Sequence, residues 1–235
     1  MTAPKYKRIL LKLSGEALSC EGGILNFEFI DRIAGVLARC KKAGVEIGVI
    51  VGAGNIWRGR QGGEMDRTQA DHMGMLATAI NALALQDRFC AAGLDAIVMS
   101  AVEMPAFADA FTVRDAKRAL EKGKTVIFAC GLGQPFFSTD TAAVLRAAEI
   151  NADAVLMAKN IDGIYTADPK KDATATRYDS ISYEEVLAKQ LKALDLSATT
   201  FCMDNGICCY AFALSDPENI YRVVMGDHIG TELHL

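Results

Sequence analysis

Short runs of apolar, often β-branched residues alternate along this chain with longer segments of helical periodicity, and this alternation limits the fold most. Buried strands are expected at Arg8–Leu13, Val45–Val51, Ala96–Met99, Thr125–Ala129 and Ala154–Ala158. Helical patterns separate them at residues 26–44, 68–92, 113–122 and 140–150. Strands that alternate with helices form parallel sheets with right-handed connections and helices on both faces. The pattern therefore predicts an α/β protein with a mainly parallel central sheet.

The last third of the chain carries more turn signals and shorter elements. Helices are expected at Tyr183–Leu191, at Leu196–Met203 and from Asp216 to Met225, and strands at Ile207–Phe212 and near Thr231. A chain of 235 residues can bury roughly 70% of the surface that its unfolded form exposes. No low-complexity linker divides the sequence. We therefore expect one domain, residues 1–235, with two lobes of about 1–158 and 159–235.

Charge, hydropathy and cysteine content exclude several classes of protein. A formal net charge of −4 argues against a nucleic-acid-binding module built on a basic face. No stretch approaches the ~20 apolar residues of a membrane helix, and a lysine interrupts the first apolar run, so neither a membrane span nor a signal peptide is expected. The seven cysteines include no CxxC, and the three histidines show no metal-ligand spacing. These features predict a cytoplasmic protein with reduced thiols and no metal held by side chains alone.

Candidate functional residues follow the ends of the expected strands, where open parallel sheets bind their ligands. These segments are Lys12–Glu16, Gly52–Asn55 with Arg58–Gly59, Gly131–Pro135 with Ser138–Asp140, and Lys159–Gly163. Glycines, hydroxyls and cations recur in them, which is the inventory of a polyphosphate site. Neither standard nucleotide motif is present: no GxxxxGK[ST] occurs, and Trp57 stands where a GxGxxG fingerprint needs its third glycine.

Three charged residues of these segments each allow two interpretations. Burying the charge of Lys12 in an apolar strand costs several kcal/mol, so either the strand end is exposed or the ammonium group meets an anion. Arg58 is either a surface cation of a glycine-rich loop or a phosphate ligand. Asp140, at the start of a helix, either caps that helix or holds Lys12 in place.

Three further residues could contact a nucleoside. Asp71 is either a simple helix N-terminal charge or a carboxylate that accepts hydrogen bonds from ribose hydroxyls. In the segment GIYTADP, Tyr165 can stack on a purine and Asp168 can accept from a ribose, unless this segment is only a hairpin.

Six motifs together resemble the bacterial-type UMP kinases (uridylate kinases) of the amino acid kinase superfamily. They are LLKLSGEAL, VGAGNIWRG, DHMGMLAT, GQPFFSTDTAA, MAKNIDGIYTADP and ALDLSATTFCMDN, in this order over nearly the whole chain. The resemblance implies a three-layer αβα sandwich and transfer of the γ-phosphoryl group of ATP to UMP, giving UDP and ADP in pyrimidine nucleotide biosynthesis. It also implies Mg²⁺ bound with ATP and a cytoplasmic homohexamer with GTP as activator and UTP as inhibitor.

The resemblance also implies roles for individual residues. The implied ATP-binding residues are Lys12, Leu13, Ser14, Gly15, Gly54, Arg58, Asn160, Tyr165 and Asp168. The implied UMP-binding residues are Ala53, Asp71, Leu132, Gly133, Gln134, Pro135, Phe136, Phe137, Ser138 and Thr139. Lys12, Arg58 and Asp140 are the implied catalytic residues. Asp195 matches a characteristic aspartate whose role is left open.

The sequence departs from the family pattern at three places. Ala53 replaces a glycine of GGGN, Leu132-Gly133-Gln134 replaces a Thr-Gly-Asn of the UMP loop, and Gln86 stands where an activator-site arginine is common. The second change bears on pyrimidine selectivity because Leu132 cannot donate a hydroxyl. The third bears on GTP activation.

The chemistry agrees with the resemblance, and two alternatives remain. A phosphate acceptor is already an anion at neutral pH, so the reaction needs cations and N–H donors and does not need a general base. One alternative is a phosphotransferase of the same superfamily that acts on a carboxylate or carbamate. The other is a storage or sensor protein that binds nucleotides or oxyanions on the same fold.

Overall fold

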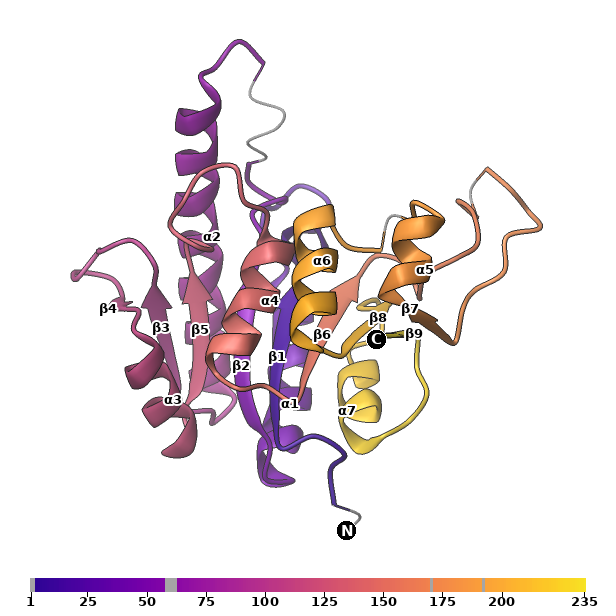
Figure 1. Cartoon of the computed structure of the whole chain (residues 1–235). Coiled ribbons are helices and arrows are strands. Elements are labelled where there is room, and N and C mark those ends of the chain that lie inside the picture. The colour runs from indigo at the N-terminus through magenta and orange to yellow at the C-terminus, as the bar shows by residue number, and fades with distance from the viewer. Residues whose placement is uncertain (1–2, 58–62, 170, 192) are drawn as a thin grey trace.

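A nine-stranded sheet forms the centre of the molecule, with helices on both sides (Figure 1). The computed structural model describes residues 3–57, 63–169, 171–191 and 193–235. The strand order is β4-β3-β5-β2-β1-β6-β8-β9-β7, and all neighbours are parallel except β8 and β9. The strands are β1 Arg8–Leu13, β2 Glu46–Val51, β3 Ala96–Ser100, β4 Asp109–Ala110, β5 Thr125–Ala129, β6 Ala154–Lys159, β7 Ser180–Ser182, β8 Cys209–Ala213 and β9 Thr231–His234.

The helices form the two outer layers. One face of the sheet is covered by α1 (Phe27–Lys42), α2 (Arg67–Ala91) and α7 (Glu218–Met225). The other face is covered by α3 (Val113–Glu121), α4 (Thr139–Glu149), α5 (Tyr183–Ala188) and α6 (Leu196–Asn205). A 3-10 helix, η1 (Gly15–Leu18), follows β1. The predicted α/β class and the implied three-layer αβα sandwich are therefore confirmed.

Alternation along β1 explains how one strand serves both layers. Ile9 and Leu11 belong to the core beneath α1, α2 and α7, whereas Leu10 belongs to the core beneath α3 to α6. Because successive side chains point to opposite faces, Lys12 lies on the same side as Leu10. The lysine therefore points toward the layer that contains α4.

The structure differs from the sequence expectations mainly at the margins of the sheet. The edge strands β4 and β7 were not expected, because two or three residues show no measurable periodicity. Helix α5 ends at Ala188, and α6 continues to Asn205. Pro217 holds the cap position of α7, although the side chain of Asp216 still accepts a hydrogen bond from the Glu218 amide at 3.2 Å. Thus the central elements follow from the sequence more closely than the edges do.

The sheet is continuous from β1 through β6 to β8, so it runs across residue 158. The division into two lobes near that residue stays a prediction. Within the described ranges, no helix is both long and apolar enough to cross a membrane.

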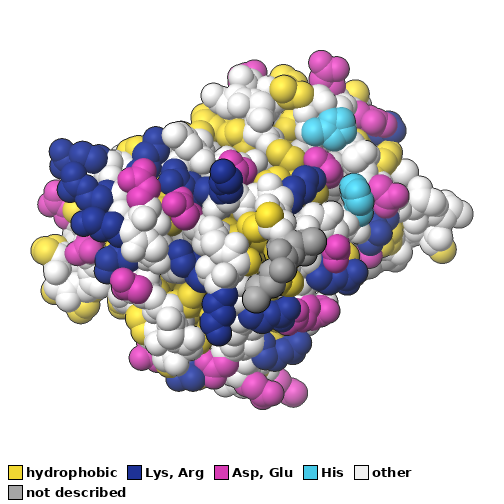
Figure 2. Space-filling model, turned by 90° about the horizontal axis from the view of Figure 1, so that it is seen from below, with side chains coloured by type: hydrophobic (Ala, Val, Ile, Leu, Met, Phe, Trp, Pro, Cys, Tyr) yellow, Lys and Arg dark blue, Asp and Glu magenta, His cyan; other side chains and the backbone are white. Residues whose placement is uncertain are grey.

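The edge at which the strands begin carries charges of both signs. Figure 2 shows this side of the molecule, with Lys and Arg interspersed among Asp and Glu. Arg8 and Glu46, at the starts of β1 and β2, form an ion pair of 2.5 Å, and Lys124 pairs with Asp95 at 3.1 Å just before β5 and β3. Arg8 also lies 4.0 Å from Glu121, so each of these two cations has at least one carboxylate nearby.

Candidate active site

A pocket of about 520 Å³ opens at the opposite edge, where β1, β2 and β5 end. The first turns of α2 project past these strand ends and form one of its walls (Figure 1). The predicted site residues that line the pocket are Lys12, Ser14, Gly15, Ala53, Gly54, Asp71, Leu132, Gln134, Phe137, Ser138 and Thr139. The structure thus brings together most of the implied phosphate-binding and UMP-binding residues.

Glycines allow the loops after β1 and β2 to approach closely. A Cβ atom at Gly15 would lie 2.4 Å from the carbonyl oxygen of Gly52 and 2.7 Å from the nitrogen of Gly54. Any side chain at Gly15 would therefore push the two loops apart. Ala53 is not among the described residues with positive φ, so its methyl group needs no unusual backbone angle.

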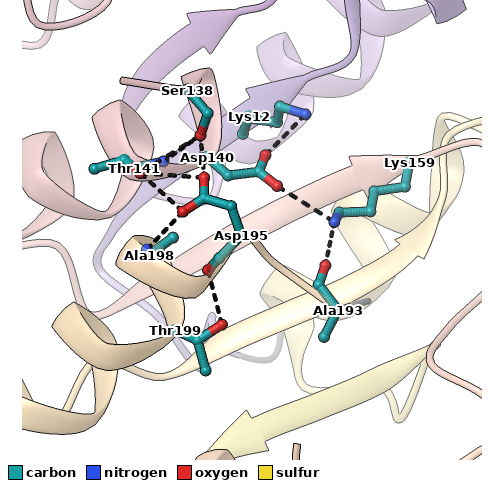
Figure 3. Close-up of polar contacts among 9 residues, drawn as sticks. All are labelled: Lys12, Ser138, Asp140, Thr141, Lys159, Ala193, Asp195, Ala198 and Thr199. Atoms are coloured by element: carbon teal, nitrogen blue, oxygen red, sulfur yellow. Dashed lines mark hydrogen bonds and ion pairs between the residues drawn. The ribbon is translucent and has the colours of Figure 1, made fainter. Parts of the chain in front are cut away.

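Lys12, Asp140 and Lys159 form a charge cluster beside the pocket (Figure 3). Lys12 Nζ lies 3.1 Å from Asp140 Oδ1, and Lys159 Nζ lies 3.5 Å from Asp140 Oδ2. Lys159 also donates to the backbone carbonyl of Ala193. The exposed fractions of the three side chains are only 12%, 18% and 19% for Lys12, Asp140 and Lys159. Two ammonium groups thus share one carboxylate in a poorly solvated place.

Burial and charge act in opposite directions on these groups. Burial would raise the pKa of Asp140, but the charges of Lys12 and Lys159 outweigh it, and the pKa lies below its ordinary value of 3.8. Burial lowers the pKa of Lys159, and although Asp140 raises it, Lys12 lowers it further. The cluster carries one unbalanced positive charge when all three groups are ionised, which suits it to an anionic ligand.

Sequence reasoning did not assign a role to Lys159. The signal was the same as for Lys12, a lysine at the C-terminal end of an apolar strand. What the sequence could not supply was the strand order, which places β6 next to β1 and aligns Lys12 with Met157 two residues before Lys159.

Asp195, whose role was open, joins α6 to α4 (Figure 3). It caps α6 by accepting from the Ala198 amide at 2.9 Å, and its carboxylate accepts from Thr141 Oγ1 at 3.0 and 3.1 Å. It also accepts from Ser138, the residue that caps α4. Because Asp140 lies in the first turn of α4, this contact fixes the helix end that carries the central carboxylate of the charge cluster.

The loop after β5 follows an unusual backbone path. Cys130 and Phe136 have φ values of 62° and 70°, and Gly131 and Gly133 are also left-handed. Asp71 Oδ2 accepts from the Phe136 amide at 2.8 Å, which ties the loop to α2. The same oxygen accepts from Arg67 Nε at 2.8 Å, and the guanidinium group of Arg67 lies 5.3 Å from the centroid of the Phe136 ring.

Other predicted residues lie elsewhere. Leu13 is buried in the core, so its side chain cannot reach a ligand in the pocket. Among the described residues, Gly133, Pro135 and Phe136 belong to the loop but do not line the pocket. Asn160, Tyr165 and Asp168 follow β6, also outside the pocket lining, and Tyr165 donates to Asp162 Oδ1 at 2.8 Å, a bond that raises the pKa of Tyr165. Arg58 lies outside the described residues.

Several lining residues were missed although a signal was present. Arg67, Gly74, Met75 and Thr78 stand four residues before Asp71 and three, four and seven after it. These spacings describe one face of a helix. Once Asp71 had been assigned to the site, its helical neighbours could have been added from the sequence alone.

Comparison with known proteins agrees with this geometry. The sequence matches the model of the amino acid kinase family over residues 7–212. A UMP kinase from Bacillus anthracis has a TM-score of 0.94 and 35% identity, with 97% of this chain and 96% of that chain covered. A UMP kinase from Ureaplasma parvum has a TM-score of 0.93 and 34% identity, with 98% of this chain and 100% of that chain covered. A uridylate kinase from Archaeoglobus fulgidus has a TM-score of 0.72 and 25% identity, with 96% of this chain and 99% of that chain covered. The chain belongs to the amino acid kinase family, and within that family it groups with the UMP kinases.

Proposed function

We propose that this protein is a UMP kinase, which transfers the γ-phosphoryl group of ATP to a phosphate oxygen of UMP and releases UDP and ADP. The observation that carries the proposal is the Lys12–Asp140–Lys159 cluster beside a pocket built from glycine-rich strand ends. The chain resembles two UMP kinases over nearly its whole length, which supports UMP as the acceptor.

The charge cluster fits the main difficulty of this reaction, which is that both reactants are anions. Catalysis of phosphoryl transfer rests on positioning and on neutralising charge in an in-line transition state. Lys12 and Lys159 supply fixed positive charge, and Asp140 keeps the two ammonium groups together against their mutual repulsion. The attacking oxygen of UMP is already ionised at neutral pH, so the site needs no residue to remove a proton. Arg58 is proposed as a third cation.

The two nucleotides divide the site between them. Asp71 and residues 132–139 are proposed to hold UMP, with Asp71 accepting from the ribose and Thr139 near the phosphate. Ser14, Gly15 and Gly54 are proposed to contact the ATP phosphates. Asn160, Tyr165 and Asp168, beyond β6, are proposed to hold the ATP nucleoside. Asp71, Ser14, Gly15 and Gly54 line one pocket, which supports placing UMP next to the ATP phosphates.

Mg²⁺ is proposed to enter with ATP. In the described ranges, no three His, Cys, Asp or Glu side chains lie together so that they could hold a metal ion. Mg²⁺ bound to a triphosphate keeps several waters and needs few protein ligands, so the residues of the pocket are compatible with it. When bound, the ion would neutralise part of the phosphate charge, while the lysines act on the rest.

Assembly, regulation and compartment are further parts of the proposal. A homohexamer built from dimers is supported by exposed apolar residues on α2, namely Met73, Leu76 and Ile80, at helical spacing. GTP as activator and UTP as inhibitor follow from the family; Gln86, at the activator-site position, donates to the Ala96 carbonyl at 3.1 Å. A cytoplasmic location is proposed because the cysteines are free thiols.

An assay of ADP production tests the proposal. The purified protein is given Mg·ATP with UMP, CMP, aspartate or carbamate, each with and without GTP, and UDP formation is checked directly. We expect the highest rate with UMP. ADP formation only with aspartate or carbamate would indicate a related phosphotransferase, and a rise in Tm with ATP without any ADP formation would indicate a binding protein.

A further inference from the structure

Asn81 and Asn55 form a reciprocal pair of side-chain amides behind the loop that follows β2. Asn81 Nδ2 donates to Asn55 Oδ1 at 2.8 Å, and Asn55 Nδ2 donates back to Asn81 Oδ1 at 2.9 Å. The second hydrogen of each amide goes to a backbone carbonyl: Asn81 to Gly52 at 2.8 Å, and Asn55 to Ile24 at 2.7 Å. Neither asparagine is among the described residues that line the pocket.

The chemistry of the outer partners sets the orientation of both amides. Backbone carbonyl oxygens can only accept, so Asn81 must turn its nitrogen toward Gly52 and Asn55 must turn its nitrogen toward Ile24. Each amide oxygen then faces the nitrogen of the other. The four contacts are therefore mutually consistent, and either amide fixes the orientation of its partner.

Asn81 is fully buried in α2, where a leucine would fill similar space and form helix more readily. A leucine would, however, remove the donor to the buried Gly52 carbonyl and the partner of Asn55, so the polar side chain is needed for this loop and not for the packing of α2. A buried amide with satisfied partners adds directional constraint, which an apolar side chain cannot supply. The feature that Asn81 constrains is the backbone of the glycine-rich loop.

That constraint determines where the loop presents its N–H groups. A trans peptide is planar, so its N–H points away from its C=O. Because the Gly52 carbonyl faces Asn81, the Ala53 N–H faces the opposite side, away from Asn81. The Ala53 carbonyl accepts from the Ile56 and Trp57 amides at 2.8 Å each, which turns the Gly54 N–H away from this turn. Both N–H groups belong to residues that line the pocket.

We infer that Asn81, acting through Asn55 and Gly52, is a positioning residue that aims the Ala53 and Gly54 N–H groups at the phosphate being transferred. The inference rests on the proposed function and extends it, since neither asparagine touches the reactants. Displacement of transition-state groups by about 1 Å can cost about 100-fold in rate. Substitution of either asparagine should therefore lower kcat more than it changes the KM for ATP or the KM for UMP.

Three variants of the full-length protein test this role: Asn81→Leu, Asn55→Ala and the double variant. For each, kcat, the two KM values and Tm are measured without GTP. We expect the single variants to lose about 10- to 100-fold in kcat, with each KM changed less than about threefold. Because the two amides act as a unit, we expect the double variant to lose little more than the worse single variant.

Asn219→Leu is the matched control. It also removes an amide that donates from a helix to a backbone carbonyl, here from α7 to that of Ala213 at 3.1 Å, but it lies outside the pocket lining. We expect its Tm to fall while kcat stays within about twofold of the wild type. Asn55→Ala, at a half-buried loop position, keeps the test informative if Asn81→Leu folds poorly.

The possible results separate this inference from the function on which it rests. If wild-type protein forms UDP but both single variants retain wild-type kcat, the pair is only structural and the inference is wrong. Losses that multiply in the double variant would overturn the view that the amides act as a unit. If wild-type protein forms no UDP from UMP, the proposed function itself is wrong and this inference falls with it.

Discussion

The two edges of the sheet use the same kinds of charged residue in opposite ways. Where the strands begin, Arg8 pairs with Glu46 and Lys124 pairs with Asp95, so each of these cations has at least one carboxylate within 4.0 Å. Where the strands end, Lys12 and Lys159 share Asp140, and these side chains are less than one-fifth exposed. Each of the two pairs at the first edge joins one cation to one anion, whereas the cluster at the second edge holds two cations to one anion.

This difference separates charge that supports the fold from charge available to a ligand. An exposed balanced pair such as Lys124–Asp95, with 35% and 64% of its side chains exposed, contributes little stability, about 0–1 kcal/mol, and attracts no particular ion. An unbalanced and partly buried cation is costly until an anion neutralises it. The comparison therefore predicts that equivalent substitutions at the two edges have very different effects.

The largest effect is expected for Lys12→Ala. If Lys12 faces the transferred phosphate as we propose, its removal should lower kcat by about 10²- to 10³-fold, by analogy with the loss of one oxyanion donor. Lys124→Ala, at the edge where the strands begin, should leave kcat unchanged. Steady-state assays with Mg·ATP and UMP measure both. A Lys12→Ala protein with wild-type turnover would show that the excess charge has no catalytic role.

Asp140→Asn tests whether the carboxylate holds the two lysines together. Without it, the ammonium groups repel each other, and we expect a loss of about 2 kcal/mol in the free energy of unfolding, measured by urea denaturation at neutral pH. Because the pKa of Asp140 is lowered, its contribution to stability is fully present above pH 3.8 and is lost as the pH falls through the lowered pKa. The difference from the wild type should therefore shrink in acid. A constant difference at all pH values would point to packing instead of charge.

The alkaline limb of the pH profile should report Lys159. Burial and then the nearby Lys12 charge lower its pKa below 10.5, so turnover should fall at a lower pH than an exposed lysine would give. Between the lowered pKa and 10.5 the unfolded chain binds more protons, so the contribution of Lys159 to stability rises with pH while activity falls. Lys159→Arg should move the fall in turnover upward by at least about one pH unit, because arginine stays protonated. If the alkaline fall in turnover stays at the same pH in Lys159→Arg, a group other than Lys159 causes it.

The core elements were predictable because both faces of the central strands are buried. β1 and β5 match the expected strands residue for residue, since an uninterrupted apolar run can hardly lie elsewhere than in a covered sheet. The edge strands β4 and β7 depend on pairing with a distant neighbour, which leaves no local pattern. The same distinction applies to the site.

At the site, local signals were readable and pairings were not. The cost of burying the charge of Lys12 suggested a contact with Asp140, and the two groups are 3.1 Å apart in the structure. Lys159 joins them only because β6 is the neighbour of β1, and Asn55 reaches Asn81 only because α2 crosses behind the loop. Strand order and layer packing are tertiary facts, and one sequence does not state them.

The smallest effect tests whether the acceptor side of the pocket can be separated from the charge cluster. Asp71→Asn removes the charge of a carboxylate that lines the pocket and accepts from the Phe136 amide, while keeping its shape. An amide oxygen accepts more weakly than a carboxylate, so we expect KM for UMP to rise about tenfold and KM for ATP less than about twofold. Arg67→Gln is the matched control, because it removes the ion pair with Asp71 but leaves the carboxylate. If Asp71→Asn raises both KM values equally, Asp71 orders the loop as a whole, and the division between acceptor and donor sides does not hold at this residue.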